Sequence, residues 1–204
     1  MKHIRWKILV ITCAVCLLPV LLGLYMWNEL PEHVAIHFNI NNEPDNFASK
    51  GFAVFVMPLF MIATQMICCI ATDIQAHKHG EQKKFVFVAK WIIPVMTLII
   101  QPVTLFYSAG WNIDIRRVAV LAVGVIFVAL GNYIPKLDYI KNYRIDTESA
   151  RKINRFCGFG MVIMGFFAII SLFFAPIVSV IWLLVLIPYV LISIIYSIVV
   201  TKRK

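Results

Sequence analysis

Six long runs of apolar residues place the strongest constraint on the fold of this chain. A helix needs about 20 apolar residues to cross the hydrocarbon core of a bilayer. Runs of this kind occupy residues 8–27, 52–72, 85–107, 118–133, 156–174 and 177–200. Five of them lack charged residues and histidine, and the third contains Lys90, which we expect to extend to the interface. None alternates like a barrel strand. The sequence predicts an all-α integral membrane protein, one domain (1–204) with six transmembrane helices.

Basic residues are distributed unevenly among the connections between these runs. The chain is 61% hydrophobic and carries a net charge of +9. Fifteen of its 19 Lys and Arg residues lie in the two termini and in the second and fourth connections, whereas the other side holds Lys50, Arg116 and Arg117. Because basic connections stay in the cytoplasm, we expect cytoplasmic termini, a cytoplasmic loop 134–155 and an outward loop 28–51. Topology and attraction to anionic lipids explain the positive charge without a direct nucleic-acid partner.

The outward loop 28–51 has the pattern of a short strand followed by a turn. Alternating apolar residues from Val34 to Ile40 have the period of a strand, and Pro31 just before them disfavours a helix. The segment Asn41 to Asp45 is rich in residues that favour turns. We therefore expect an extracellular strand and turn, or a short hairpin, between the first and second helices.

Two histidines of this loop raise the hypothesis of a zinc site. His33 and His37 lie near Glu32, Glu43 and Asp45, and imidazole and carboxylate groups are competent zinc ligands. On a strand, however, residues four positions apart are roughly 13 Å apart, which is too far to share one ion. A recognition or structural loop is the better interpretation, and we predict no metal or other cofactor.

The predicted helices contain little that supports enzyme chemistry. They hold no paired nucleophile and base, so we expect a protein that is not an enzyme. All five cysteines fall inside the helices and are interpreted as small buried hydrophobic residues. A transporter or channel is the alternative function, and its support is limited to Lys90, Gln101, several prolines and a few Ser and Thr residues.

Several short motifs resemble the SdpI/YhfL family of bacterial multi-pass membrane proteins. The extracellular motifs are Leu30-Pro31, His37-Phe38-Asn39, Pro44-Asp45 and Ser49-Lys50, with Asn42 where the family signature usually has Gly. The stretch from Gly131 to Lys136 is similar to the family sequence that enters its large cytoplasmic loop, and Glu148, Arg155 and Gly158 match later positions. Residues 142–147 depart from the family sequence.

The resemblance implies a protein of the bacterial cytoplasmic membrane that confers immunity to a secreted killing peptide. In the best-known member, toxin capture also sequesters a DNA-binding repressor at the membrane. The implied partners are a peptide toxin outside and a repressor inside. The candidate partner-binding residues are His37, Asn39, Pro44, Asp45, Lys50, Arg144, Glu148 and Arg155. For residues 139–155, an amphipathic helix on anionic lipid, with Thr147 as its N-cap, is favoured over a dedicated repressor-binding surface.

Overall fold

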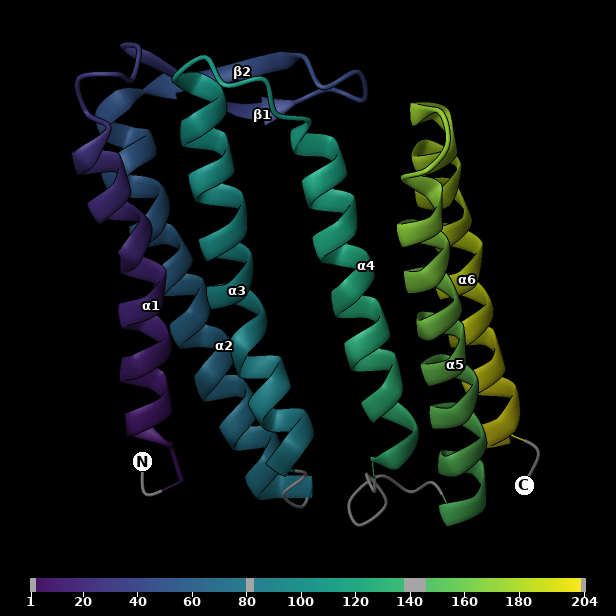
Figure 1. Cartoon of the computed structure of the whole chain (residues 1–204). Coiled ribbons are helices and arrows are strands. Elements are labelled where there is room, and N and C mark those ends of the chain that lie inside the picture. Colours follow the sequence, from purple (N-terminus) through teal and green to yellow (C-terminus); the bar gives the residue numbers. More distant parts are fainter. Residues whose placement is uncertain (1–2, 80–82, 138–145, 203–204) are drawn as a thin grey trace. The chain divides into compact units, whose positions relative to one another are not determined.

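The computed structural model describes residues 3–79, 83–137 and 146–202 (Figure 1). Within them, six helices are long and apolar enough to cross a membrane. The helices are α1 (Trp6–Tyr25), α2 (Met57–His79), α3 (Lys83–Ser108), α4 (Ile115–Tyr133), α5 (Thr147–Ser171) and α6 (Pro176–Lys202). A π-helix, η1 (Phe52–Val56), precedes α2, and a 3₁₀ turn, η2 (Ile134–Lys136), follows α4. Two strands, β1 (His33–Phe38) and β2 (Pro44–Ser49), lie between α1 and η1. The predicted fold class is confirmed.

Several helices are longer than their apolar runs. Helix α2 continues past Thr72 to His79, and α4 begins at Ile115 and so includes two arginines in its first turn. These extensions were missed because hydropathy marks the part of a helix that lies in hydrocarbon, whereas its polar ends reach the headgroups.

The start of α5 corrects the predicted amphipathic helix. Asp146 is the N-cap, and its side chain accepts hydrogen bonds from the backbone N–H groups of Glu148 and Ser149. The expectation that Thr147 caps a separate helix is therefore wrong, and residues 139–145 of that predicted helix lie outside the described residues. Residues 147–155 are the first turns of α5 itself, because an aspartate at the N-cap satisfies the free N–H groups of the first turn.

The chain divides into two compact units. The first contains residues 1–73 and 90–122, and the second contains residues 74–89 and 123–204. The first holds α1, the hairpin, η1 and most of α2 and α3. The second holds α5, α6, the last part of α4 and the first turns of α3.

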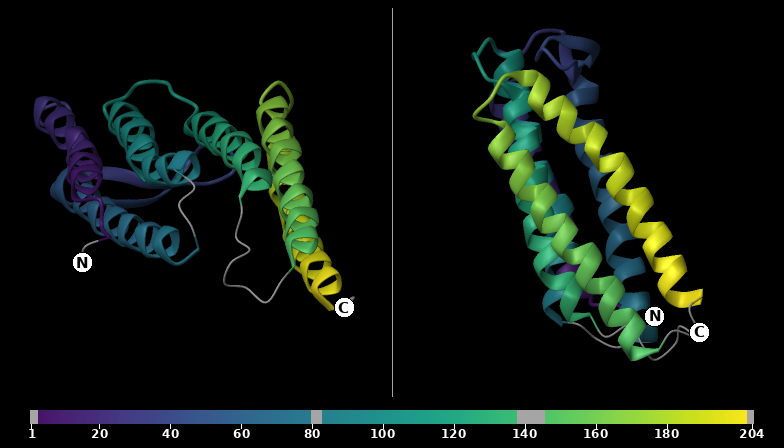
Figure 2. Two further views of the ribbon diagram at one scale, coloured as in Figure 1. Left: turned by 90° about the horizontal axis from the view of Figure 1, so that it is seen from below. Right: turned by 90° about the vertical axis from the view of Figure 1, so that its right-hand side faces the viewer.

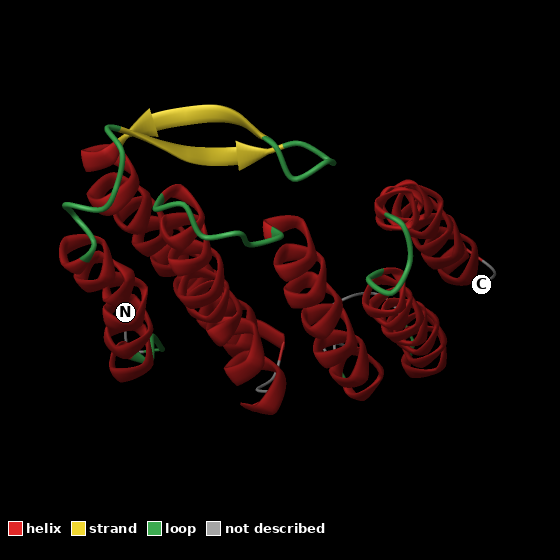
Figure 3. Cartoon of the chain, turned by 45° about the horizontal axis from the view of Figure 1, so that its top comes forward, coloured by secondary structure: helices red, strands yellow, loops and turns green. Residues whose placement is uncertain are grey.

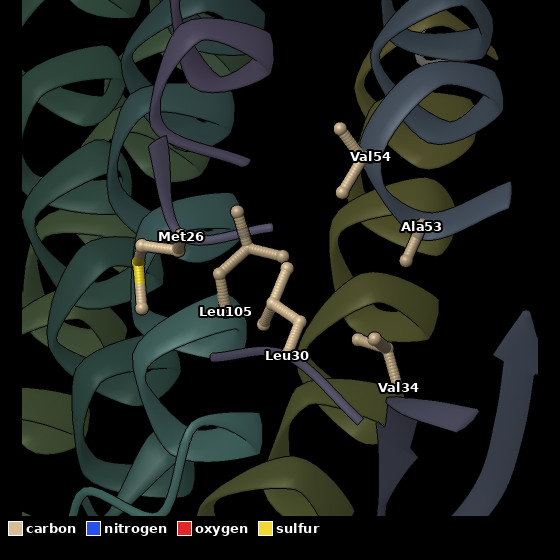
Figure 4. Packing of buried hydrophobic residues seen from close by; sticks show 6 residues of the cluster. All are labelled: Met26, Leu30, Val34, Ala53, Val54 and Leu105. Carbon is tan, nitrogen blue, oxygen red and sulfur yellow. The ribbon is translucent and has the colours of Figure 1, made fainter. Parts of the chain in front are cut away.

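The hydrophobic core of the first unit lies against strand β1 (Figure 4). It brings together side chains that come from four segments, the turn after α1, β1, η1 and α3: Met26, Leu30, Val34, Ala53, Val54 and Leu105. Val34 and Val54 are completely buried. Burying one such side chain is worth about 1.5–3 kcal/mol where the alternative is water. The core therefore fastens β1 to the membrane helices.

Strands β1 and β2 form an antiparallel hairpin (Figure 3). The register pairs His33 with Ser49 and Phe38 with Pro44, with an irregularity around His37. The predicted strand and turn are confirmed, but Pro44 and Asp45 belong to β2 and not to the turn. A proline is tolerated as the first residue of an edge strand because no ladder hydrogen bond is lost there.

In the second unit, α5 and α6 pack against each other (Figure 2). Their polar groups are matched in pairs across the interface. The buried Trp182 indole donates to the Met164 carbonyl oxygen at 2.7 Å, and the Tyr189 hydroxyl donates to the Cys157 carbonyl oxygen at 2.6 Å. Hydrogen bonds of this kind help to hold helices together where lipid removes the hydrophobic driving force.

Helices α4 and α5 approach closely at two pairs of glycines. A Cβ atom on Gly165 would lie 2.6 Å from the carbonyl oxygen of Gly124, and one on Gly158 would lie 2.8 Å from that of Gly131. In each helix the two glycines are seven residues apart, which is close to two turns and places both on one face. Small residues let membrane helices pack backbone against backbone.

Candidate functional site

The tip of the hairpin is organised by asparagine side chains. The Asn39 carboxamide oxygen accepts hydrogen bonds from the backbone N–H groups of Asn41 and Glu43, and its nitrogen donates to the Glu43 carboxylate. An asparagine that binds nearby backbone amides in this way stabilises a turn. Asn39, a candidate for partner binding, thus has a definite role in shaping the loop.

Asn42 joins the hairpin tip to the connection between α3 and α4. Its φ of 64° lies in the left-handed region, where asparagine is the best substitute for glycine. Its side-chain nitrogen donates to the Ile113 carbonyl oxygen at 3.0 Å, and its oxygen accepts from the Arg116 backbone N–H at 3.3 Å. The resembled signature has glycine at this position. The asparagine keeps the turn conformation, and its two side-chain hydrogen bonds clamp the hairpin tip to the connection between α3 and α4.

Asp114 completes this clamp at the start of α4. Its carboxylate accepts the Arg117 backbone N–H at 3.0 Å and an Arg116 guanidinium N–H at 3.0 Å. Burial alone raises the pKa of Asp114, but these hydrogen bonds and the two positive charges outweigh that effect and hold the pKa below its ordinary value. The carboxylate therefore stays ionised at neutral and mildly acidic pH, and its contribution to stability is lost only as strong acid protonates it.

We expect Asn42→Ala to destabilise the outward face more than Asn42→Gly. Glycine keeps the positive φ and loses the two side-chain hydrogen bonds, whereas alanine loses these bonds and strains the backbone by about 1–3 kcal/mol. Hydrogen exchange of the hairpin amides in detergent should show faster exchange in the order native, Gly variant, Ala variant. Equal exchange in all three proteins would contradict the clamp.

The candidate residues of the outward loop differ in their availability. His37 and Asp45 are largely exposed and form a cross-strand pair, with 2.5 Å between His37 Nδ1 and Asp45 Oδ1. Pro44 is half-buried at the start of β2. Among the described residues, no group of three or more His, Cys, Asp and Glu side chains is placed to hold a metal ion. Among the outward candidates, His37 and Asp45 are thus the two whose side chains are exposed.

Lys50 points inward, and its ammonium group is engaged by neighbouring groups of the same chain. Its ammonium group donates to the carbonyl oxygens of Trp27 and Leu30 and pairs with the Glu32 carboxylate at 3.2 Å. It also lies 5.1 Å from the centre of the Trp27 ring. Lys50 therefore ties the end of the hairpin to the segment that follows α1.

The cytoplasmic candidates are only partly described. Glu148 and Arg155 are exposed in the first turns of α5, where Glu148 pairs with Lys152 one turn later at 2.6 Å. Arg144 lies outside the described residues. Two of these three candidates thus lie on one helix, with their charged groups accessible.

The π-helix η1 has an identifiable cause in Pro58. Met57 N–H bonds to the Phe52 carbonyl oxygen five residues earlier, but Pro58 has no N–H for the Ala53 carbonyl oxygen. The Gln101 side chain on α3 donates to this oxygen instead, at 2.6 Å. By its polarity alone, Gln101 is a candidate for a transport pathway. Its side chain is instead engaged in a hydrogen bond to the Ala53 carbonyl oxygen. Single π turns are frequent at functional sites.

A cavity of about 220 Å³ lies beside this π turn, and we call it the hairpin cavity. Strand β1 forms one wall through Val34 and Ile36, and η1, α2 and α3 form the others. Its lining is mostly apolar and includes three methionines, Met57, Met61 and Met96. The lining hydroxyls of Thr97 and Thr104 donate to carbonyl oxygens of their own helix, so they add little polarity. For scale, a dry cavity of about 150 Å³ binds benzene.

A buried ion pair is the main feature that the sequence analysis missed. Lys90 is completely buried, and its ammonium group donates to the Asp73 carboxylate at 2.6 Å. The Asp73 carboxylate also accepts the Arg5 backbone N–H at 2.9 Å. The expectation that Lys90 reaches the interface is wrong because α2 continues beyond Thr72 and places a counter-ion beside it. The signal was an aspartate one residue past an apolar run.

Gln65 extends this polar cluster along α2. Its side-chain nitrogen donates to the Lys90 carbonyl oxygen at 2.8 Å and to the Cys69 sulfur at 3.1 Å. Thr12 of α1 lies 3.7 Å from the same sulfur. The cluster therefore links α1, α2 and α3 through buried groups, each of which meets a partner from another element.

Two comparisons with known proteins give a match. Residues 14–62, which include most of α1, the hairpin and η1, match the model of a domain of unknown function, DUF1648. The chain is 24% identical to the immunity protein SdpI of Bacillus subtilis (strain 168) over 172 residues, which is 81% of each chain. The six apolar helices, together with this similarity, support a multi-pass membrane protein. No solved structure matches it.

Proposed function

We propose that this protein is a membrane immunity protein that intercepts a secreted antimicrobial peptide at the outer face of the bacterial cytoplasmic membrane. The observation that carries the proposal is the relation to an immunity protein across 81% of the chain. The uneven distribution of basic residues supports an outward hairpin and an inward basic face that is attracted to anionic lipids.

The hairpin and the hairpin cavity are the proposed peptide-binding site. The exposed His37–Asp45 pair offers polar contacts at the rim, and the cavity offers an apolar pocket for one or two side chains of the peptide. Methionine side chains adapt to differently shaped apolar groups because they are unbranched and polarizable. A peptide that inserts into membranes must itself carry apolar side chains.

A cytoplasmic repressor partner is an extension of the same proposal. Glu148 and Arg155 offer accessible charged groups for it on α5. Immunity is favoured over transport because Lys90 and Gln101, the polar groups that a pathway needs, are engaged with Asp73 and the Ala53 carbonyl oxygen. Substrate-dependent flux in proteoliposomes would reverse this preference.

The direct test is survival of toxin-sensitive bacteria that express the protein. They are challenged with secreted peptides from the native host and its close neighbours, and an empty vector serves as the control. Protection at verified membrane abundance supports immunity. Absence of protection against every peptide at normal abundance counts against it.

A change that fills the hairpin cavity should reduce protection. Thr104 lines the cavity, so Thr104→Phe places a large side chain where the peptide is proposed to bind. Thr104→Val keeps the size and removes the hydroxyl, and it is the matched control. We expect bacteria that express the Phe variant to be killed by a peptide concentration at least about tenfold lower. This corresponds to a loss of about 1.4 kcal/mol of binding free energy. Unchanged protection by the Phe variant at equal abundance would exclude the cavity as the peptide site.

A further inference from the structure

The second unit contains a cavity whose lining is basic. It has a volume of about 570 Å³, within the range of about 300–1,000 Å³ that is usual for small-molecule sites. The start of α3 contributes Lys83, Lys84 and Phe85, and the end of α4 with η2 contributes Asn132, Tyr133 and Lys136. Two segments far apart in the sequence thus contribute three lysines to the lining of one cavity.

No carboxylate among the described lining residues neutralises these lysines. Within the described ranges, Lys83, Lys84 and Lys136 form no ion pair; Glu81 and Asp138, close in sequence, lie outside those ranges. Lys136 is held at the cavity by neutral groups, because it donates to the Asn132 side-chain oxygen at 3.2 Å and lies 5.5 Å from the centre of the Tyr133 ring. Three positive charges around one cavity repel each other until an anion binds between them.

Two further features favour a phosphate over other anions. Lysine is a common phosphate-binding residue. Phe85 and Leu137 add an apolar wall beside these charges, which suits a group that carries both a phosphate and apolar chains.

We propose that this cavity binds a phosphate-bearing anion, with an anionic phospholipid headgroup as its source in the membrane. In the predicted topology the cavity lies at the cytoplasmic interface, where basic pockets between transmembrane helices bind such headgroups. The site does not depend on the proposed immunity function. The basic residues at these helix ends would thus bind a ligand, in addition to their role in orienting the protein in the membrane.

The experiment measures lipid binding to the purified full chain by native mass spectrometry. Phosphatidylglycerol, phosphatidylcholine and inorganic phosphate are the probes. The test protein is the triple variant Lys83→Gln, Lys84→Gln and Lys136→Gln. The matched control changes three exposed basic residues that do not line the cavity: Lys7→Gln, Arg151→Gln and Lys202→Gln. A Lys→Arg version of the test variant keeps the charges and checks for folding damage.

We expect phosphatidylglycerol to bind the native protein, the control and the arginine variant, and to bind the glutamine variant roughly 100-fold more weakly, since each lysine near an anionic surface is worth about fivefold. Displacement of the lipid by millimolar inorganic phosphate would identify a free phosphate as a competing source of the same chemistry. Equal lipid binding by the glutamine variant and the control, or equal binding of phosphatidylcholine, would overturn the proposal.

Discussion

An Asp73→Asn variant is expected to lose most of its folded population. The change leaves the Lys90 ammonium group completely buried without a counter-ion, and it weakens the cap that Asp73 provides at the start of α1. Breaking a buried ion pair from one side costs about 3–5 kcal/mol, which is a large share of the roughly 5–15 kcal/mol by which proteins are usually stable. The measurement is the fraction of monodisperse protein after heating in detergent.

The double variant Asp73→Asn with Lys90→Met separates the charge effect from a loss of packing. Because it leaves no unpaired charge in the interior, it should recover most of the stability that the single variant loses. Lys7→Met, at an exposed position, is the control and should behave like the native protein. A double variant that is as unstable as Asp73→Asn would show that the individual side chains, and not their charge balance, hold the three helices together.

Gly165→Ala is expected to push α4 and α5 apart. The new methyl group would lie 2.6 Å from the Gly124 carbonyl oxygen, and backbone atoms of a neighbouring helix cannot rotate away as a flexible side chain can. Overpacking of this kind costs about 1–3 kcal/mol. We expect a lower midpoint in thermal unfolding and a smaller yield of folded protein from membranes.

The control for this prediction is the same substitution at Gly51. Its backbone is helical, with φ of −61°, and a Cβ atom there would meet nothing within 4 Å. Alanine also favours a helix over glycine by about 1 kcal/mol, so Gly51→Ala should be neutral or stabilising. If both alanine variants have the same midpoint of thermal unfolding as the native protein, the close approach of α4 and α5 does not contribute to stability.

Much of the architecture follows from local patterns in the sequence. A helix is one of the two structures that satisfy every backbone group inside lipid, so a long apolar run predicts a membrane helix without knowledge of its neighbours. The hairpin is equally local, because alternating residues from Val34 and a turn rich in asparagine specify it. The positive φ at Asn42 agrees with the turn that was expected there.

The candidate site was harder to predict because its contacts join distant residues. Gln101 and Ala53 are 48 residues apart, and Asn42 and Ile113 are 71 apart. No local pattern shows that the carboxamide of Gln101 replaces the N–H that Pro58 lacks. The hairpin cavity likewise exists only after β1, η1 and α3 meet.

The sequence by itself determined that this chain is a multi-pass helical membrane protein with a polar hairpin after its first helix, since lipid imposes rules on each segment separately. The tertiary structure decided which partners its buried polar groups contact. The sequence alone suggests that Lys90 extends to the headgroups, but the structure places Asp73 beside it. Likewise, only the structure shows that Gly124 lies at a close contact with Gly165. Partners of this kind are chosen by helix packing, and hydropathy carries no information about which faces of two helices meet.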